Sequence, residues 1–466
     1  MEKKVSKKEI TLYGLAASAQ SIGQIVPFTY VNMFMTDYLF ISAGVTGTVL
    51  LIAKIIDFVV CLASGVIMEK VRMPWGRYAS WYKVLPWIVA TGCILQMIDT
   101  TGFISSELIR AGIVLVGYCC LHCCMSFITT ARGGIMQKMA GADMNMRKTL
   151  STRQVQFTAA TTIISSAITL PAIQLMQPVA GESGGYLVVT LIFNVFYLTV
   201  MQMFVKMSQK YDPPTTDFGQ AKKAATIKEI FQSIAINRQM QVLVIVYTLF
   251  SVGTQLFAGL CVYYYKVIIN QFSMMTVVTT IRSVVAFGAS LVVPTIGKKL
   301  GKKMSLVVGM GTYAVCVLGI YFFALKSIWI LTFFLCLAQS GMYLYTGFGA
   351  NFYLDCGEYG YYETGKDFRT IAISVMNVPT KIGFAIGGSA VSFGLAFIGY
   401  EAGMTVTPEF TSDFMMLIGL VPAILMFAAA AVAFFFYKLT DEQAEFYAKE
   451  NEKRELEIAN AEMAQA

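Results

Sequence analysis

The sequence predicts an all-α membrane protein with twelve transmembrane helices arranged in two six-helix halves. Its composition is the first reason: 56% of the 466 residues are hydrophobic and 13% are charged, against about 25% charged residues in an ordinary soluble domain. The second is that the apolar residues form continuous blocks, long enough for the roughly 20 residues that cross a bilayer. The third is that lysine and arginine cluster between these blocks. Together these observations exclude a soluble enzyme, a fibrous protein and a disordered chain.

Twelve apolar blocks occur along the chain, and each predicts one membrane helix. They cover residues 11–38, 45–67, 81–99, 107–136, 154–177, 186–206, 240–266, 272–295, 304–325, 328–353, 369–399 and 413–437. Several are longer than a bilayer requires, which predicts tilted or kinked helices. A β-barrel would instead need segments of about ten residues with alternating polarity, and the sequence shows none.

The chain divides near its middle, where a polar stretch separates six blocks from six. Within this stretch, residues 227–236 predict an amphipathic helix lying on the membrane surface. A basic loop follows the second helix of each half, at 68–77 and 297–303, which indicates an internal repeat of the kind found in secondary transporters. We therefore expect four parts: an N-terminal six-helix half (1–206), a cytoplasmic central loop (207–239), a C-terminal six-helix half (240–437) and a cytoplasmic tail (438–466).

The distribution of positive charge predicts the orientation of these helices. Lys and Arg concentrate in the segments on the same side as the two termini, whereas the opposite side has little beyond Lys266 and Lys326. Cytoplasmic loops carry such an excess, so we expect a multi-pass protein of the cytoplasmic (inner) membrane with both termini in the cytoplasm. The net charge of +8 belongs to these loops, and we expect no nucleic-acid partner.

Several segments, spread in order over nearly the whole chain, resemble the glycoside–pentoside–hexuronide:cation symporter family of the major facilitator superfamily. The segment G-T-V-L-L-I-A-K-I-I-D at 47–57 is similar to the family pattern G-T-L-x-L-x-A-R-x-x-D. The segment D-C-G-E-Y-G-Y-Y-E-T-G-K at 355–366 parallels A-D-x-x-D-Y-G-E-W-K-T-G-K. Shorter matches are W-G-R-Y at 75–78, R-K-T-L-S-T-R at 147–153 and Y-Y-Y-K at 263–266.

The resemblance implies the major facilitator fold and secondary active uptake of a small solute by alternating access about a central cavity. It implies a small-molecule solute, a coupling cation and the lipid bilayer as partners, and a monomer. The sequence holds no nucleotide-binding G-x-x-x-x-G-K-[ST] signature and no carboxylate pair or His cluster placed for catalysis. We therefore expect a transporter without cofactors, and neither an enzyme nor a primary pump.

Asp57, in the middle of the second block, is the expected cation-coupling residue. A carboxylate there costs about 2.5–3.5 kcal/mol on insertion scales, so it is normally retained for a pathway or a partner. Lys54 lies one turn earlier, and the alternative is that the two side chains only neutralise each other. Sodium-coupled members of the family have a second acid four residues later, where this chain has Cys61. A thiol is a poor ligand for a hard cation, so we expect proton coupling rather than sodium coupling.

The substrate site implied by the resemblance also departs from the family. Melibiose permeases bind sugar hydroxyls with two carboxylates that are missing here. The position in the first helix is Ser21, which lies beside Gln20 and Gln24. The position in the fourth helix falls on Ile128 or Thr129.

Four cations are expected around the cavity, against Asp57 as its one acid. Arg153 and Lys381 align with family cations of the cavity, and Arg132 and Arg282 lie in the fourth and eighth blocks. Guanidinium groups bind carboxylates in a bidentate fork, so we expect an anionic substrate: a hexuronide, another acidic glycoside or an organic acid. The alternative is that Arg132 and Arg153 only extend toward the cytoplasmic interface. Tyr263 offers a face for stacking on a ring, or else packs between helices.

The segment after the tenth block is expected to gate the cytoplasmic side. Its candidates are Asp355, Glu358 and Lys366, and the alternative is a solvated loop held by a salt bridge. After 437, the sequence T-D-E-Q at 440–443 predicts a capping box, followed by a charged helix that we expect to be solvated.

Two alternative functions follow from other features. One is transport of an organic or aromatic acid. The other is export of a metal or drug through the fourth helix, which carries C-C-L-H-C-C at 119–124. Thiolates and an imidazole suit copper(I) or zinc, but cysteine is also a common small residue of packed helices. We expect packing and no metal site.

Overall fold

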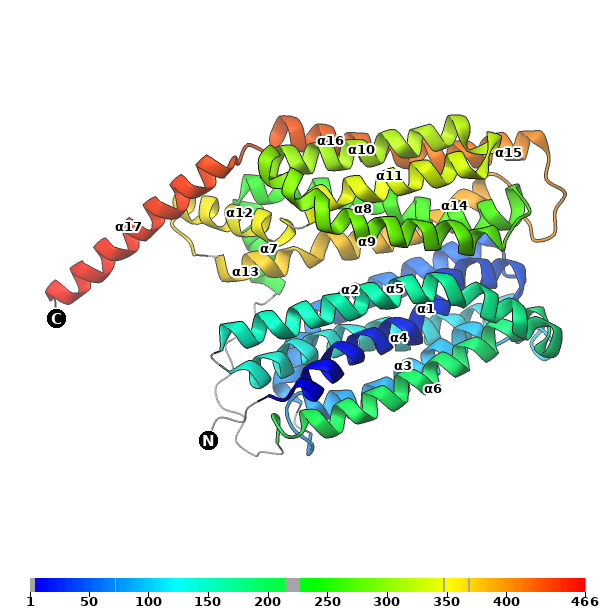
Figure 1. The fold of residues 1–466 in the computed structure, drawn as a ribbon, viewed down its shortest axis with the longest axis horizontal. Helices are drawn as coiled ribbons and strands as arrows, with labels where there is room; N and C mark the ends of the chain where they lie inside the picture. The colour runs from blue at the N-terminus through cyan, green and yellow to red at the C-terminus, as the bar shows by residue number, and fades with distance from the viewer. Residues whose placement is uncertain are drawn as a thin grey trace. The chain divides into compact units, whose positions relative to one another are not determined.

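The structure, a computed structural model, describes residues 5–71, 73–141, 143–213, 227–346, 348–367 and 369–465. The central-loop residues 214–226, part of the stretch expected at 207–239, lie outside the described residues. Within the described ranges the regular structure is entirely helical, as the composition predicts (Figure 1). The helices are α1 Lys7–Asp37, α2 Ala43–Lys70, α3 Ala79–Met97, α4 Glu107–Ala140, α5 Met144–Ala180, α6 Glu182–Ser208, α7 Ile227–Ile236, α8 Arg238–Tyr263, η1 Tyr264–Ile268, α9 Met274–Leu300, α10 Lys302–Phe323, η2 Ala324–Lys326, α11 Ile328–Thr346, α12 Gly349–Thr364, α13 Arg369–Val375, α14 Asn377–Phe397, α15 Pro408–Met415, η3 Met416–Leu420, α16 Val421–Phe436 and α17 Asp441–Gln465.

Ten helical spans of the described residues are long and apolar enough to cross a membrane. Helices α1 and α3 lie at two further predicted blocks, but they are not apolar enough to be counted among these spans. In α1, polar residues such as Gln20 and Gln24 interrupt the apolar sequence. The protein is therefore a multi-pass membrane protein, and the count of twelve stays a prediction. The amphipathic segment predicted at 227–236 is confirmed as helix α7, Ile227–Ile236.

The predicted blocks differ from the helices mainly where a helix changes its winding. Helix α8 continues into the π-helix η1, and α15 continues through the π-helix η3 into α16. The block predicted at 369–399 is interrupted at residue 376, between α13 and α14. Such π-turns add a residue to one turn, which a pattern of apolar residues does not reveal.

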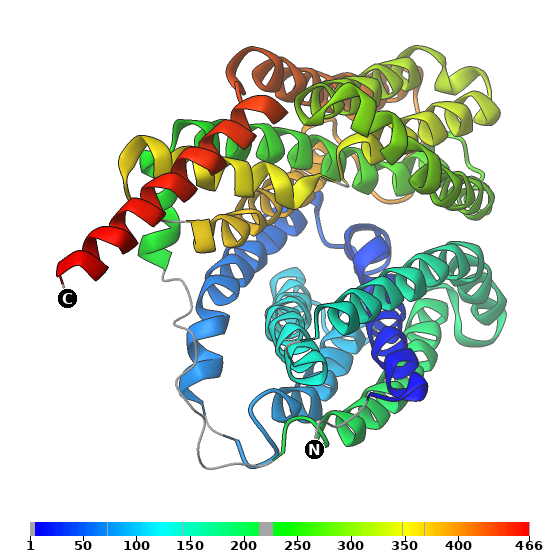
Figure 2. The same cartoon turned by 60° about the vertical axis from the view of Figure 1, so that its left-hand side comes forward.

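The chain forms two compact units. The first comprises residues 1–224, 261–283 and 389–407, and the second comprises 225–260, 284–388 and 408–466. In the first unit α3 packs on α4 and α6, while α1 packs on α5 and α6 and α2 packs on α4 (Figure 2). In the second, α10 packs on α11 and α16, and α12 packs on α13 and α17.

Helices α3 and α4 cross at backbone contact. A Cβ atom added at Gly92 would lie 2.6 Å from the carbonyl oxygen of Gly117, and one added at Gly117 would lie 2.9 Å from that of Gly92. Within a bilayer there is no hydrophobic force to bring helices together, and small residues allow the close approach that replaces it. These two glycines therefore fix the distance between α3 and α4.

The tail forms helix α17, which begins with the predicted capping box. The Gln443 amide donates to Thr440 Oγ1 at 3.3 Å, and the Thr440 amide donates to Gln443 Oε1 at 3.2 Å. Most of α17 is exposed, as expected for a charged helix, but one side of it runs beside α12 (Figures 1 and 2). The rings of Tyr359 and Tyr447 contact at 5.5 Å, and Asn451 is 1% exposed.

Candidate coupling, substrate and gating sites

The predicted coupling residues lie on one face of α2, against α4. Asp57 and Lys54 are one turn apart, and both are buried, at 3% and 7% exposure. Ser126 Oγ donates to Asp57 Oδ1 at 3.5 Å. The Lys54 ammonium lies over the ring of Tyr118, 4.8 Å from its centroid. The aromatic face offers the cation an electrostatic contact inside the membrane, so a carboxylate and an ammonium are both held within the apolar span.

The residues of α4 that face this pair form a stripe spaced by one turn. Tyr118, His122 and Ser126 are four residues apart, so they share a face of the helix. The rings of Tyr118 and His122 stack with centroids 4.0 Å apart and planes at 22°. No group of three His, Cys, Asp or Glu side chains suited to a metal ion occurs among the described residues, and the cysteines of 119–124 lie in a helix without such a cluster.

Of the predicted substrate residues of α1, Gln20 reaches across to α4, where it contacts Met125. Gln20 is buried and directs Nε2 to the Met125 sulfur at 3.2 Å, while Gln20 Oε1 has no hydrogen-bond partner among the described residues. The hydroxyls of Ser21 and Thr129 bond within their own helices, to the carbonyl oxygens of Ala17 at 3.3 Å and Met125 at 2.9 Å. Gln24 lies one turn beyond Gln20 on α1 and is half-buried.

Arg132 lies two turns beyond Met125 on α4 and is held by α3. Its Nε donates to the Tyr82 hydroxyl at 3.3 Å, and that hydroxyl donates to the Ile128 carbonyl at 3.0 Å. The Arg132 Nη2 group is buried and has no hydrogen-bond partner in the part of the chain that the structure describes. Burying a polar group without a partner costs free energy, so this donor is available for an anion.

The other predicted cations are less enclosed. Arg153 is exposed on α5, where its Nη1 donates to Gln156 Oε1 at 3.3 Å. Arg282 on α9 is half-buried and belongs to the first unit, whereas Lys381 on α14 is half-buried and belongs to the second. Arg132 is half-buried, whereas Arg153 is exposed. The exposure of Arg153 fits the alternative in which this arginine only extends toward the cytoplasmic interface.

The predicted gating acids are both paired in the second unit. Asp355 forms an ion pair with Lys302, which also lies 3.4 Å from Asp441 Oδ1 at the start of α17. Glu358 accepts a hydrogen bond from Asn451 at 2.7 Å. Lys366 is exposed, and its backbone amide donates to Thr364 Oγ1 at 3.3 Å.

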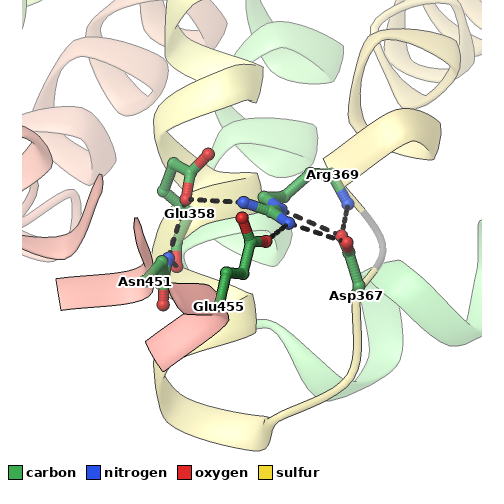
Figure 3. Close-up of polar contacts among 5 residues, drawn as sticks. All are labelled: Glu358, Asp367, Arg369, Asn451 and Glu455. Carbon is green, nitrogen blue, oxygen red and sulfur yellow. Dashed lines mark hydrogen bonds and ion pairs between the residues drawn. The ribbon is translucent and has the colours of Figure 1, made fainter. Parts of the chain in front are cut away.

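Arg369 is the centre of the segment predicted to act as a gate, and it was not among the residues predicted for that role. Figure 3 shows its guanidinium between three carboxylates: Asp367 at 2.8 Å, Glu358 at 3.6 Å, and Glu455 of α17. These residues and Asn451 make up the Arg369 cluster. The hydrogen bond from Arg369 lowers the pKa of Asp367 although burial opposes this, and the same bond raises the pKa of Arg369. The cluster ties the tail helix to α12 and α13.

A second charged cluster, also missed, lies where α1 ends. Asp37 Oδ2 pairs with Lys266 Nζ at 2.6 Å, and Asp37 Oδ1 accepts from the hydroxyls of Thr36 at 2.7 Å and Tyr400 at 2.8 Å. The Thr36 hydroxyl also lies 3.0 Å from that of Tyr263, the tyrosine predicted for the substrate site. Thr36, Asp37, Tyr263, Lys266 and Tyr400 make up the Asp37 cluster. Lys266 was a signal for it, as one of the few cations on the side where the sequence predicts almost none.

Comparison with known proteins gives the family. A family model described as MFS/sugar transport protein matches residues 12–441. The chain belongs to this family. Over 96% of its length, the chain is 25% identical to the isoprimeverose transporter of Lactiplantibacillus pentosus, and it covers 92% of that protein. Over 95% of its length, it is 23% identical to the glucuronide carrier protein homolog of Escherichia coli strain K12, and it covers 95% of that protein. A solved structure of the xylose transporter XylE from E. coli, in a partially occluded inward open conformation, matches with a TM-score of 0.62 at 11% identity, covering 93% of this chain and 98% of that one.

These matches confirm the family resemblance read from the motifs. The chain is a transporter of the major facilitator superfamily, not an enzyme. The likeness to XylE shows the fold alone, because so few residues are identical.

Proposed function

We propose that the protein is a secondary transporter that imports a small anionic sugar derivative by alternating access, coupled to protons. In this proposal twelve helices form two six-helix halves in the cytoplasmic membrane, both termini are cytoplasmic, and the protein works as a monomer. The names of the relatives support a sugar-type substrate, since one is an isoprimeverose transporter and another a glucuronide carrier homolog. The symporters among the relatives support a coupling cation.

The observation that carries the coupling part is the burial of Asp57 on a membrane-spanning helix, beside the Ser126 hydroxyl, with Cys61 instead of a second carboxylate on the adjoining turn. A hard cation binds through several oxygen ligands, and Cys61 cannot supply one. A proton needs only a single carboxylate. Lys54, which the ring of Tyr118 accommodates, is one turn before Asp57 on α2, and we propose that it balances the charge of Asp57 when the proton leaves.

The coupling ion is tested by sodium replacement in right-side-out vesicles. Uptake at fixed pH should stay the same when choline replaces sodium and should rise with an inward proton gradient. Asp57→Asn should abolish accumulation against a gradient while retaining exchange of labelled solute. Cys61→Asp provides the matched gain of function, because it adds the missing acid and should introduce sodium dependence. A large loss of wild-type uptake in choline would contradict proton coupling.

The anionic substrate is supported by Arg132, whose buried Nη2 has no partner among the described residues. Carboxylated sugars such as glucuronides should compete with the substrate, and neutral glycosides should compete poorly. Arg132→Gln should weaken binding of the anion by about 2–5 kcal/mol, the usual cost of removing one partner of a desolvated charge pair. Lys381→Gln should weaken it in the same direction.

A matched control lies on the same helix. Arg110→Gln removes the same charge near the other end of α4, where Arg110 Nη1 donates to the Ile104 carbonyl at 3.0 Å, and it should leave the preference for anions unchanged. Tight binding of neutral glycosides that Arg132→Gln does not alter would show that the substrate is not anionic.

A further inference from the structure

The Asp37 cluster joins three segments that are far apart in the sequence. Asp37 is the last residue of α1, Lys266 belongs to the π-helix η1, and Tyr400 follows α14. Lys266 and Tyr400 are 229 and 363 residues from Asp37. All three segments belong to the first unit. Because α1 starts next to the N-terminus, its last residue lies at the opposite end of the helix, on the side away from that terminus.

The geometry points to the Asp37 cluster as a latch that holds the outer ends of α1, η1 and α14 together and closes the transport pathway on the extracellular side. This inference rests on the proposed alternating access. Uptake through such a pathway requires these contacts to break when substrate enters from outside and to form again before it is released inside.

The contacts suit a closure that is firm and reversible. The Asp37 side chain is 8% exposed and accepts from one ammonium and two hydroxyls, so its charge is satisfied in the closed state. The rings of Tyr263 and Tyr400 pack edge to face at 5.3 Å. A cavity of about 430 Å³ adjoins the cluster, lined by Thr36, Tyr400, Glu107 and Glu401 among others. Water in this cavity can hydrate the freed groups, which lowers the cost of separating them.

The layer beneath the cluster is closed in the same state. One to two turns deeper, Ser392 of α14 is fully buried and its Oγ donates to Asn32 Oδ1 of α1 at 3.2 Å. Ser392 therefore reports whether the outer ends of α1 and α14 have separated. Ala396, one turn nearer the surface on α14, is exposed and lines the cavity, so it provides a reporter outside the closure.

The test introduces a thiol by Ser392→Cys and measures its reaction with a membrane-impermeant maleimide applied from outside, without substrate, by mass spectrometry of the labelled peptide. Labelling should be slow in the parent and should rise by about tenfold or more when Asp37→Asn or Lys266→Met is added, since each tenfold change in an opening equilibrium corresponds to about 1.4 kcal/mol. The exchange Asp37→Lys with Lys266→Asp should slow labelling again. In a parallel series, Ala396→Cys should react at one rate in every background.

Two controls separate opening from unfolding. Native Cys93 is fully buried on α3 and should stay unlabelled throughout. If Asp37→Asn also exposes Cys93, the comparison moves to Tyr400→Phe, which removes one hydrogen bond to Asp37 and keeps the ring against Tyr263; faster labelling of Ser392→Cys in that background supports the latch.

Equal labelling of Ser392→Cys in the parent and in the folded variants would overturn the latch. The labelling experiment needs no substrate, so its result is independent of the proposal that the substrate is an anion. The latch can be supported when the anionic substrate is refuted, and the anionic substrate can be supported when labelling refutes the latch.

Discussion

The Asp37 cluster and the Arg369 cluster use similar groups in different surroundings. The Asp37 cluster has one carboxylate, at 8% exposure, met by the hydroxyl of the adjacent Thr36 and by the ammonium of Lys266 and the hydroxyl of Tyr400 from two distant segments. The Arg369 cluster has one guanidinium met by three carboxylates, two of them nearly half exposed, at 47% for Asp367 and 46% for Glu455. Charges are worth more where water is excluded and less where it screens them. The first cluster should therefore depend on every member, whereas the second tolerates the loss of one.

Asp37→Asn should have the largest effect on stability. It leaves Lys266 without a carboxylate, and removing one partner of a buried ion pair typically costs about 3–5 kcal/mol, with the lower end expected because Lys266 is 27% exposed. Thermal unfolding of the purified protein in detergent measures the loss. In a double-mutant cycle with Lys266→Met, the double variant should lose much less than the sum of the two single variants. Additive losses would remove the contrast between the clusters.

Arg369→Gln should have the next largest effect. It leaves Glu358, Asp367 and Glu455 near one another without their shared cation, and we expect a loss of about 1–2 kcal/mol, the range for a hydrogen-bonded but partly hydrated charge. Raising the ionic strength from about 0.1 to 1 M should reduce this loss, because the Debye length falls from about 10 to 3 Å. The loss in Asp37→Asn should change less with salt. Equal salt sensitivity in the two variants would contradict the difference in hydration.

Asp367 gives a smaller, pH-dependent effect. Its pKa in the folded protein is lowered by Arg369, so its contribution to stability is present above the ordinary aspartate pKa of about 3.9 and is lost as the pH falls through the folded value. The wild type should be more stable than Asp367→Asn near neutral pH, and the difference should shrink on acidification below about pH 4. Unfolding midpoints of both proteins from pH 7 downward measure it. A difference that grows on acidification would show that the sign is wrong.

Glu455→Gln should have the smallest effect. The side chain is 46% exposed and belongs to the tail helix, and an exposed ion pair contributes about 0–1 kcal/mol. Asn451→Ala is the useful comparison, because Asn451 is buried and donates to both the backbone and the side chain of Glu358 at 2.9 and 2.7 Å. It should destabilise the docked tail more than Glu455→Gln does. Limited proteolysis of α17 ranks the two variants, and the reverse order would refute the importance of burial.

The parts of the molecule that follow from local pattern were predictable from the sequence. The amphipathic helix α7 has the predicted bounds, and the capping box before α17 forms as predicted. A salt bridge in the segment of Asp355 and Glu358 was expected as the alternative to a gating role, but the partners of these two acids were not predicted. Lys302 is 53 residues away from Asp355, and a single sequence does not indicate which cation a given acid meets.

The docking of the tail was missed for a related reason. The charges of α17 predict a solvated helix, yet Asn451 and Ala444 are buried against the second unit. Aromatic contacts of α12 with Tyr447 and Phe446 accompany them. Long-range pairing likewise explains why the Asp37 cluster was missed. Neither Asp37 nor Lys266 shows its partner in its own segment, and Tyr400 offered no signal in its own segment.

The backbone contact between Gly92 and Gly117 has a consequence for the substrate site proposed at Arg132. It fixes α3 against α4, and the Tyr82–Arg132 hydrogen bond spans the same two helices. The guanidinium is therefore held in one orientation before any solute arrives, and its rotational entropy is lost during folding instead of during binding. Binding to a preorganised group keeps more of its interaction energy as affinity. Under the proposed function, a methyl group at Gly117 should weaken transport from a distance, because it would push α3 from α4 and strain the Tyr82–Arg132 hydrogen bond.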